Sequence, residues 1–196
     1  MWALVLVGGF SRRMGRSKQD LPFGAGTLLE RTVAVAQEFA EEVVLVGDDA
    51  AASRLGLRGA PDWQAGAGPL SGLAGGLAVC PQGLHALLAC DLPFLTGDLL
   101  HRMVGLARGA EAVVPVVEGR RHPLCALYRT DCLQPARACL SLDKRRMDDL
   151  LDRVEFHEVT PEQVLPLDLA RAVMNVNTPE QYHQALQFLE TDEHGP

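Results

Sequence analysis

The amino-acid sequence predicts an α/β protein in three layers, with helices on both faces of a doubly wound, mostly parallel sheet. Runs at Trp2–Val7, Glu42–Val46 and Leu84–Cys90 are almost continuously apolar, as in strands that are buried on both faces. Helical patterns separate these runs through the first 110 residues, and such alternation is typical of parallel sheets. A chain of 196 residues can bury a large core without outside help, so we expect one domain over residues 1–190 and a short tail over residues 191–196.

Local signals predict the elements of the first half. Thr27-Leu28-Leu29-Glu30 matches a capping box and predicts a helix that reaches about Ala40. Pro69 is a favoured first residue of a helix, and Thr96 or Asp98 is a suitable cap. The further elements expected here are a short helix over Ala50–Leu55, a short strand over Leu57–Ala60, a loop over Asp62–Gly68, and helices over Pro69–Val79 and up to Ala107.

The second half has more closely spaced strands, which predict that an antiparallel pair is inserted into the sheet. Gly119 marks a turn between two of these strands. Thr178-Pro179-Glu180 has the pattern of a helix start. The elements expected are strands over Ala112–Val117, Pro123–Tyr128 and Val154–Val159, helices over residues 130–140 and 144–151, and a last helix from Thr178.

Composition excludes several classes of protein. The formal charge of −7 argues against broad binding of nucleic acid. The sequence has no run of 18 apolar residues, and its apolar start lacks the basic segment of a signal peptide, so neither a membrane span nor export is expected. The five cysteines form no CxxC pair, which favours reduced thiols in the cytoplasm over disulfides or a metal site.

The segment from Leu6 to Lys18 is the first candidate binding loop. Gly8 and Gly9 let the backbone approach a ligand and turn its N–H groups toward anionic oxygens. Arg13 and Lys18 would neutralise phosphate charge. The loop is neither a Walker A motif nor a GxGxxG fingerprint. It therefore predicts a grip on a nucleotide triphosphate, the alternative being a solvated basic loop.

Asp91 is the second candidate, because it follows the buried strand that ends at Cys90. Ligands of open α/β sheets bind outside the carboxyl ends of the strands, so Asp91 and the loop after the first strand should converge on one face. Mg²⁺ prefers a few carboxylate oxygens, with phosphates and water completing its shell. Asp91 is thus predicted to hold Mg²⁺, although an Asp that caps the next turn has the same appearance.

Two further segments are candidates, and for the second of them a purely structural explanation is the stronger one. Asp62, with Gly68 and its neighbouring small residues, would allow close approach of a nucleotide base or sugar, or simply close packing of helix on sheet. Asn175–Glu180 also reads as an ordinary helix start. His122 follows Arg120 and Arg121 and could hold a second anionic substrate, or be plain surface.

Together these motifs resemble the molybdenum cofactor guanylyltransferases, also called molybdopterin-guanine dinucleotide biosynthesis protein A. The resemblance spans nearly the whole chain, with the motifs in order. The family pattern LAGGxSxRMGxDK appears as Leu6–Lys18, and the GPLaG segment as Gly68–Gly72. CDxPf appears as Cys90–Phe94, and NVNTPe as Asn175–Glu180.

The resemblance implies a Rossmann-like nucleotidyltransferase fold that transfers GMP from GTP to molybdenum-bound molybdopterin and releases pyrophosphate. It further implies transient contacts with proteins that deliver or receive the cofactor. The implied catalytic residues are Arg13, Lys18 and Asp91, with Mg²⁺ on Asp91. The implied nucleotide-binding residues are Leu6, Val7, Gly8, Gly9, Lys18, Asp62, Gly68 and Asp91.

This sequence departs from the family pattern at three places. Val7 replaces a small Ala, Ser17 replaces the usual Asp, and Gly47-Asp48 stands where relatives often carry an Asn near the guanine. The double glycine at Gly8-Gly9 favours guanine over cytosine. A molybdenum cofactor cytidylyltransferase, a sugar-phosphate nucleotidyltransferase and a non-catalytic nucleotide-binding module remain as alternatives.

Overall fold

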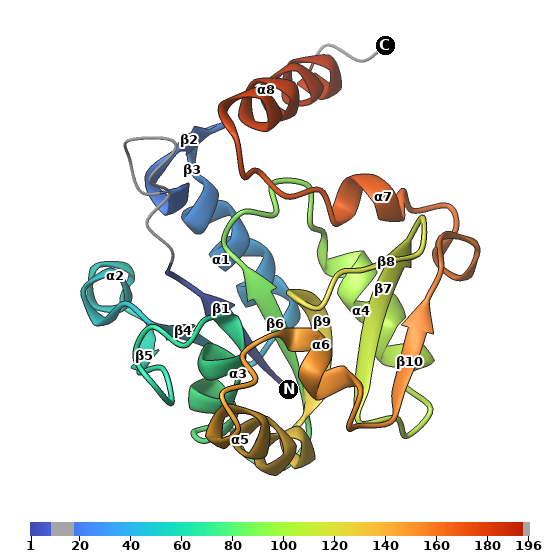
Figure 1. Ribbon diagram of the computed structural model, residues 1–196. Helices are drawn as coiled ribbons and strands as arrows, with labels where there is room; N and C mark the ends of the chain where they lie inside the picture. Colours follow the sequence, from blue (N-terminus) through green and yellow to red (C-terminus); the bar gives the residue numbers. More distant parts are fainter. Residues whose placement is uncertain (9–17, 194–196) are drawn as a thin grey trace.

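The structure, a computed structural model, describes residues 1–8 and 18–193. Its centre is an eight-stranded sheet in the order β10-β7-β9-β6-β1-β4-β5, with β8 paired to β7 (Figure 1). A separate small sheet pairs β2 with β3. The strands are β1 Trp2–Leu6, β2 Pro22–Phe23, β3 Gly26–Thr27, β4 Glu42–Val46, β5 Arg58–Ala60, β6 Leu84–Ala89, β7 Ala112–Val117, β8 Arg120–Arg121, β9 Cys125–Arg129 and β10 Phe156–Val159.

The sheet is parallel over the four neighbouring strands β6, β1, β4 and β5, and it is mixed from β6 to its other edge, as the sequence predicts. β1 runs parallel to both β4 and β6, and β4 runs parallel to β5. β9 is antiparallel to β6 on one side and to β7 on the other, while β10 returns to the parallel direction beside β7. The inserted antiparallel strand β9 therefore separates the parallel half of the sheet from the edge formed by β7 and β10.

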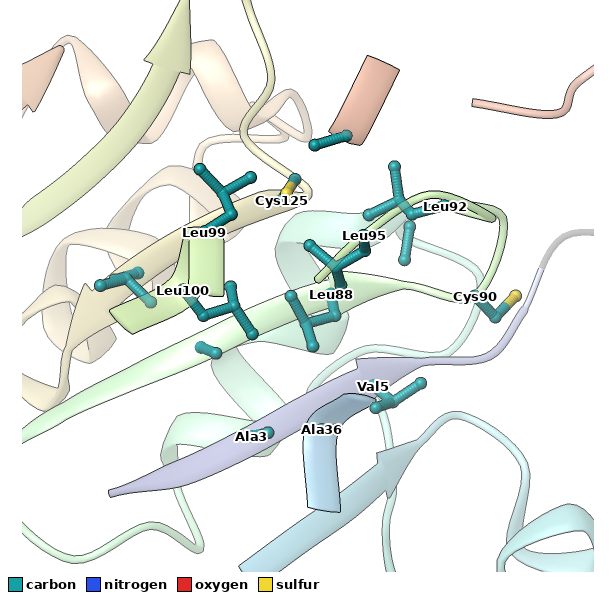
Figure 2. Packing of buried hydrophobic residues seen from close by; sticks show 14 of the residues in the cluster. Ala3, Val5, Ala36, Leu88, Cys90, Leu92, Leu95, Leu99, Leu100 and Cys125 are labelled. Atoms are coloured by element: carbon teal, nitrogen blue, oxygen red, sulfur yellow. The ribbon is translucent and has the colours of Figure 1, made fainter. Parts of the chain in front are cut away.

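Helices cover both faces, which gives the predicted three layers. Side chains at Ala3, Val5 and Leu88 lie on one face, where Figure 2 shows them packed with Ala36 and Leu99. On the other face, Leu4, Val44 and Leu87 are buried with side chains of α3, α5 and α6. The helices are α1 Leu28–Phe39, α2 Asp49–Leu55, α3 Pro69–Leu77, α4 Gly97–Leu106, α5 Leu133–Ser141, α6 Met147–Leu151, α7 Leu169–Ala172 and α8 Pro179–Glu193.

A third buried cluster attaches α8 to the small sheet β2–β3 (Figure 1). The hydroxyl of Tyr182 donates a hydrogen bond to the carbonyl of Pro22, across 160 positions of sequence. The cluster consists of Leu21, Phe23, Leu28, Phe94, Val176 and Ala185, with Met174, Tyr182, Leu186 and Leu189 packed against it. The end of the chain is thereby joined to the segment that follows Lys18.

Most predicted elements are confirmed within a few residues of their expected ends. Thr27 caps α1 with the predicted capping box, and Thr96, rather than Asp98, caps α4. The sequence did not predict the three 3₁₀ turns at Lys18–Asp20, Thr130–Cys132 and Pro161–Val164, nor the short elements β2, β3, β8 and α7. These elements have only two to four residues each, so periodicity has little to act on.

The last helix is longer than predicted. We expected a tail from Thr191, but α8 continues to Glu193. The Thr191 hydroxyl donates to the carbonyls of Gln187 and Phe188, which satisfies helical carbonyls near the end of the chain. Among the helices that the structure describes, none is long and apolar enough to cross a membrane.

Candidate active site

A cavity of about 580 Å³ opens at the carboxyl ends of β1, β4, β5 and β6. It lies where the sequence placed the site, because the parallel register sets the end of β1 at Leu6 beside the end of β6 at Ala89. Gly9 and Arg13 fall outside the described residues. The other predicted site residues all line this cavity: Leu6, Val7, Gly8, Lys18, Asp62, Gly68 and Asp91.

Asp91 is a buried carboxylate directly after β6, with 8% of its surface exposed. Its Oδ2 lies 3.4 Å from Nζ of Lys18, and its Oδ1 accepts a hydrogen bond of 3.3 Å from Nδ2 of Asn175. Burial raises the pKa of Asp91 because the charged form is desolvated, and the ammonium of Lys18 offsets part of this rise. A group that is costly to bury as an anion will gain from a second cation.

Lys18 reaches two oxygens at once. Besides Asp91, its ammonium donates a hydrogen bond to Oδ1 of Asn177. Lys18 begins a 3₁₀ turn, and its side chain lines the cavity together with Asp91, which follows β6. The ammonium therefore sits between a carboxylate and an amide, in a position where it can turn to an incoming anion.

Asn175 and Asn177 are site residues that the sequence placed in a candidate segment without assigning either of them a role. The first donates to Asp91 and the second accepts from Lys18, while the amide between them, that of Val176, donates to the Asp91 carbonyl at 3.0 Å. Polar and apolar residues alternate here, which could have indicated the site: the two Asn flank the buried Val176, so both side-chain amides point away from the core. The helix start that follows masked this pattern.

Asp62 follows β5 and lies against two glycines. A Cβ on Gly72 would come within 3.3 Å of Oδ1 of Asp62, and one on Gly47 within 3.6 Å of the same atom. Gly47 has φ +97° and its Cβ would meet the Val7 carbonyl at 2.5 Å, so this position accepts only glycine. Burial raises the pKa of Asp62, which reflects a half-desolvated carboxylate on the cavity wall.

Gly68 directly precedes α3 and lines the same cavity. With φ +81° it adopts a conformation that side chains disfavour, and it serves as the N-cap without a side-chain hydrogen bond. Pro69 opens the helix. The backbone of this segment is thus open to a ligand in the cavity.

The departures from the family pattern find local explanations where the structure describes them. Val7 has its side chain buried among residues of the α1 side of the core. Asp48 caps α2 through the Ala51 amide at 2.9 Å and accepts a hydrogen bond from Nε2 of Gln19 at 3.2 Å. These two contacts fix Asp48, and the hydrogen bond from Gln19 joins the end of β4 to the turn that carries Lys18. Ser17 lies outside the described residues.

A second cavity of about 730 Å³ adjoins the first. Arg120, Leu124 and Asn175 line both cavities. Basic side chains are frequent around the second cavity, which Arg121, His122 and Arg146 also line. Burial lowers the pKa of His122, and the charge of Arg120 lowers it further. His122 is therefore neutral near pH 7, and the arginines carry the positive charge of this cavity.

The carboxylates that the structure describes fit a metal shared with a substrate better than a metal held by protein alone. Among the described residues no group of three or more His, Cys, Asp or Glu side chains gathers. Asp91 is a single buried carboxylate facing a cavity of nucleotide size. Mg²⁺ commonly takes one or two carboxylates together with phosphate oxygens and water, so the side chains present suit that ion.

Comparison with known proteins adds a family and relatives. Residues 3–159 match the family described as the MobA-like NTP transferase domain. A protein of Pelotomaculum thermopropionicum named probable molybdenum cofactor guanylyltransferase is 34% identical, over 98% of this chain and 95% of its own length. One of Mesorhizobium japonicum, named molybdenum cofactor guanylyltransferase, is also 34% identical, over 96% and 95% of the two chains.

Solved structures agree in fold. The crystal structure of molybdopterin-guanine dinucleotide biosynthesis protein A from Archaeoglobus fulgidus superposes with a TM-score of 0.85. It covers 97% of this chain and all of its own, at 24% sequence identity. The similarity covers nearly the whole chain, so the parallel half of the sheet and its antiparallel insertion both belong to the shared fold.

Proposed function

The chain belongs to the family of MobA-like NTP transferase domains, and we infer from this that it is a molybdenum cofactor guanylyltransferase. It transfers GMP from GTP to molybdenum-bound molybdopterin, forms molybdopterin guanine dinucleotide and releases pyrophosphate. The observation that carries this conclusion is the cluster of Lys18, Asp91 and Asn177 at the mouth of a nucleotide-sized cavity. The two relatives, which match almost end to end, supply the identity of the substrates.

We propose that GTP occupies the cavity at the carboxyl ends of β1, β4, β5 and β6. Backbone N–H groups of the loop through Gly8 and Gly9 would cradle the triphosphate, with Arg13 and Lys18 neutralising its charge. Leu6, Val7 and Gly68 would line the nucleoside, and Asp62 would contact the guanosine through a sugar hydroxyl. This proposal is supported because every one of these residues that the structure describes lines this cavity.

Nucleotide binding would change the partner of Lys18. In the structure its ammonium lies 3.4 Å from the Asp91 carboxylate and offsets the cost of burying that charge. A triphosphate brings several negative charges, and an ammonium on a flexible stem can turn toward them. Asp91 would then be left as an uncompensated buried anion, which a divalent cation can neutralise.

We propose that this cation is Mg²⁺, held by Asp91. When bound, Mg²⁺ would supply positive charge near the phosphate oxygens and the departing pyrophosphate. The buried carboxylate, its raised pKa and the acceptance of phosphate and water by Mg²⁺ support this assignment. Asn175 would orient the carboxylate through its 3.3 Å hydrogen bond.

The proposed transfer of GMP requires no proton transfer by a side chain of the protein. The attacking group is a phosphate, which is ionised at neutral pH, so no general base is needed. The chain acts by holding donor and acceptor in line and by neutralising charge, which are the main contributions to phosphoryl and nucleotidyl transfer. This fits a cavity whose described lining includes no histidine.

The direct test supplies the purified protein with GTP labelled at the α-phosphate, Mg²⁺ and molybdenum-bound molybdopterin. We expect labelled molybdopterin guanine dinucleotide, with release of one pyrophosphate for each dinucleotide. CTP, UTP and ATP serve as matched donors in place of GTP. Product formed from CTP but not from GTP would favour a cytidylyltransferase, and nucleotide binding without pyrophosphate release would favour a non-catalytic module.

Further proposals concern the setting of the enzyme. We propose that residues 1–190 form one nucleotidyltransferase domain, supported by the packing of α8 on β2–β3. We propose a cytoplasmic location, supported by five free cysteines, of which Cys90, Cys125 and Cys132 have pKa values raised to about 12 by burial. Transient contacts with proteins that deliver the cofactor or receive it remain a proposal from the family resemblance.

A further inference from the structure

Arg120 and Arg121 are adjacent in sequence but point in different directions. Both belong to β8, which pairs antiparallel with the end of β7, with Val117 opposite Arg120 and Val116 opposite Arg121. Successive side chains of a strand point to opposite faces. The tight turn at Glu118 and Gly119, which have φ +52° and +74°, fixes this register. The two guanidinium groups therefore meet different surroundings.

Arg121 is neutralised by acidic side chains. Its Nη1 lies 3.8 Å from Asp148 and 3.7 Å from Asp152, and its Nε lies 3.9 Å from Glu158. Its guanidinium also stacks on the ring of Phe156, 4.8 Å from the centroid. These contacts join β8 to α6 and β10. Arg121 therefore has a structural role in the wall of the second cavity, and the surrounding carboxylates neutralise its charge.

Arg120 has the opposite properties. Its side chain is exposed, and within residues 1–8 and 18–193 it forms no ion pair. It lines the nucleotide cavity and the second cavity alike. Of the other cations around the second cavity, Arg146 is paired with Asp148 at 3.6 Å and its side chain is 82% exposed, and His122 is neutral near pH 7. Arg120 is thus the described cation at the junction that is available to an anion.

The proposed reaction requires a cation at the junction of the two cavities. The acceptor's terminal phosphate must approach the α-phosphate of GTP, and two anions repel each other unless a cation stands between them. An oxygen of the acceptor phosphate forms a bond to the α-phosphorus, the bond from that phosphorus to the bridging oxygen breaks, and the electron pair leaves with pyrophosphate. Lys18 lies on the donor side, beside Asp91, and does not line the second cavity.

We propose that Arg120 binds the attacking terminal phosphate of the acceptor and holds it against the α-phosphate of the donor nucleotide. This proposal rests on the function inferred above and assigns the second cavity to the acceptor. A guanidinium suits the task because its planar fork can donate two hydrogen bonds to oxygens of the acceptor phosphate. Arg120 therefore determines acceptor binding and the rate of transfer, with little effect on the binding of GTP alone.

The test compares Arg120→Ala, Arg120→Lys and Arg121→Ala in the full chain. For Arg120→Ala we expect kcat/KM for the acceptor to fall about 10- to 100-fold, because a charge-assisted contact to the acceptor phosphate is lost. The Kd for GTP, measured by calorimetry, stays within about twofold and the Tm within about 1 °C, because Arg120 forms no ion pair among the described residues. Arg120→Lys recovers part of the rate because it keeps the charge but not the fork.

Arg121→Ala separates a ligand contact from a structural one. It should lower the Tm by a few degrees, since it removes three carboxylate contacts and one ring contact. An Arg120→Ala enzyme with unchanged kcat/KM for the acceptor, or with GTP affinity lowered as much as acceptor turnover, would overturn the proposal. A wild-type protein that makes no dinucleotide from GTP would overturn the proposed function and, with it, the role of Arg120, whereas an active wild type with an unaffected Arg120→Ala variant overturns the role of Arg120 alone.

Discussion

The two adjoining cavities are built in different ways. The nucleotide cavity is formed mainly by backbone at the ends of parallel strands, with glycines where the chain must pass closely, as at Gly47 and Gly72. The second cavity is formed by the antiparallel insertion, α6 and β10, and its character comes from charged side chains such as Arg120 and Arg121. The first therefore depends on close backbone packing at its glycines as well as on the charges of Lys18 and Asp91, whereas the second depends mainly on its charged side chains.

This difference explains what the sequence could predict. Lys18, Asp62 and Asp91 were predictable because strand ends of a parallel sheet converge, and a buried apolar run shows where each strand ends. Asn175 was not selected, since it reaches Asp91 across 84 positions of sequence and its neighbours look like a plain helix start. Arg120 could be suspected as an anion contact but not told from Arg121, because their roles depend on the hairpin register.

The small elements were the least predictable part of the fold. β2 and β3 have two residues each and exist because α8 packs on them, a contact between distant parts of the chain. The large elements were predicted well because their own residues carry the signal: α1 has a capping box, and β4 and β7 are apolar runs. Long-range packing is what local patterns leave out.

The largest effect is expected from the carboxylate of the nucleotide cavity. Asp91→Ala should lower Mg²⁺-dependent turnover at least about 100-fold, since it removes the proposed metal ligand from a desolvated site. The fold should persist, because burial raises the pKa of this carboxyl and its charge opposes folding. Steady-state release of pyrophosphate and circular dichroism check both parts. Near-normal turnover would remove Asp91 from the metal site.

A smaller effect tests the sensitivity of the nucleotide cavity to volume. A Cβ on Gly75 in α3 would lie 2.0 Å from the Pro61 carbonyl, so Gly75→Ala must shift the backbone next to Asp62. We expect a loss of about 1–3 kcal/mol in the free energy of unfolding, together with weaker GTP binding.

Gly105→Ala is the matched control for this substitution. Gly105 lies in α4, is exposed and would meet nothing within 4 Å, so alanine should stabilise the protein by about 0.5–1 kcal/mol through its helix propensity. Denaturant unfolding of both variants compares them. Equal behaviour of the two alanines would contradict the close packing of α3 beneath Asp62.

The smallest effects come from two tyrosine hydroxyls that each donate to a proline carbonyl. Tyr182 holds Pro22, just after the turn of Lys18, and Tyr128 holds Pro123 in the wall of the second cavity. Tyr182→Phe should weaken GTP binding a few-fold, and Tyr128→Phe should raise the KM for the acceptor instead, each by about 1 kcal/mol or less. Calorimetry with GTP and acceptor-dependent kinetics distinguish them, and a reversed pattern would show that the two cavities are assigned the wrong way round.

Calorimetric titration of wild-type protein and Lys18→Ala with GTP, in the presence and absence of Mg²⁺, tests the central claim most directly. The account predicts that Mg²⁺ strengthens binding to the wild type, and that Lys18→Ala weakens it at least about 10-fold, because a charge-assisted contact to phosphate is lost. GTP affinity that is the same in both proteins would contradict the nucleotide grip at Lys18 and Asp91.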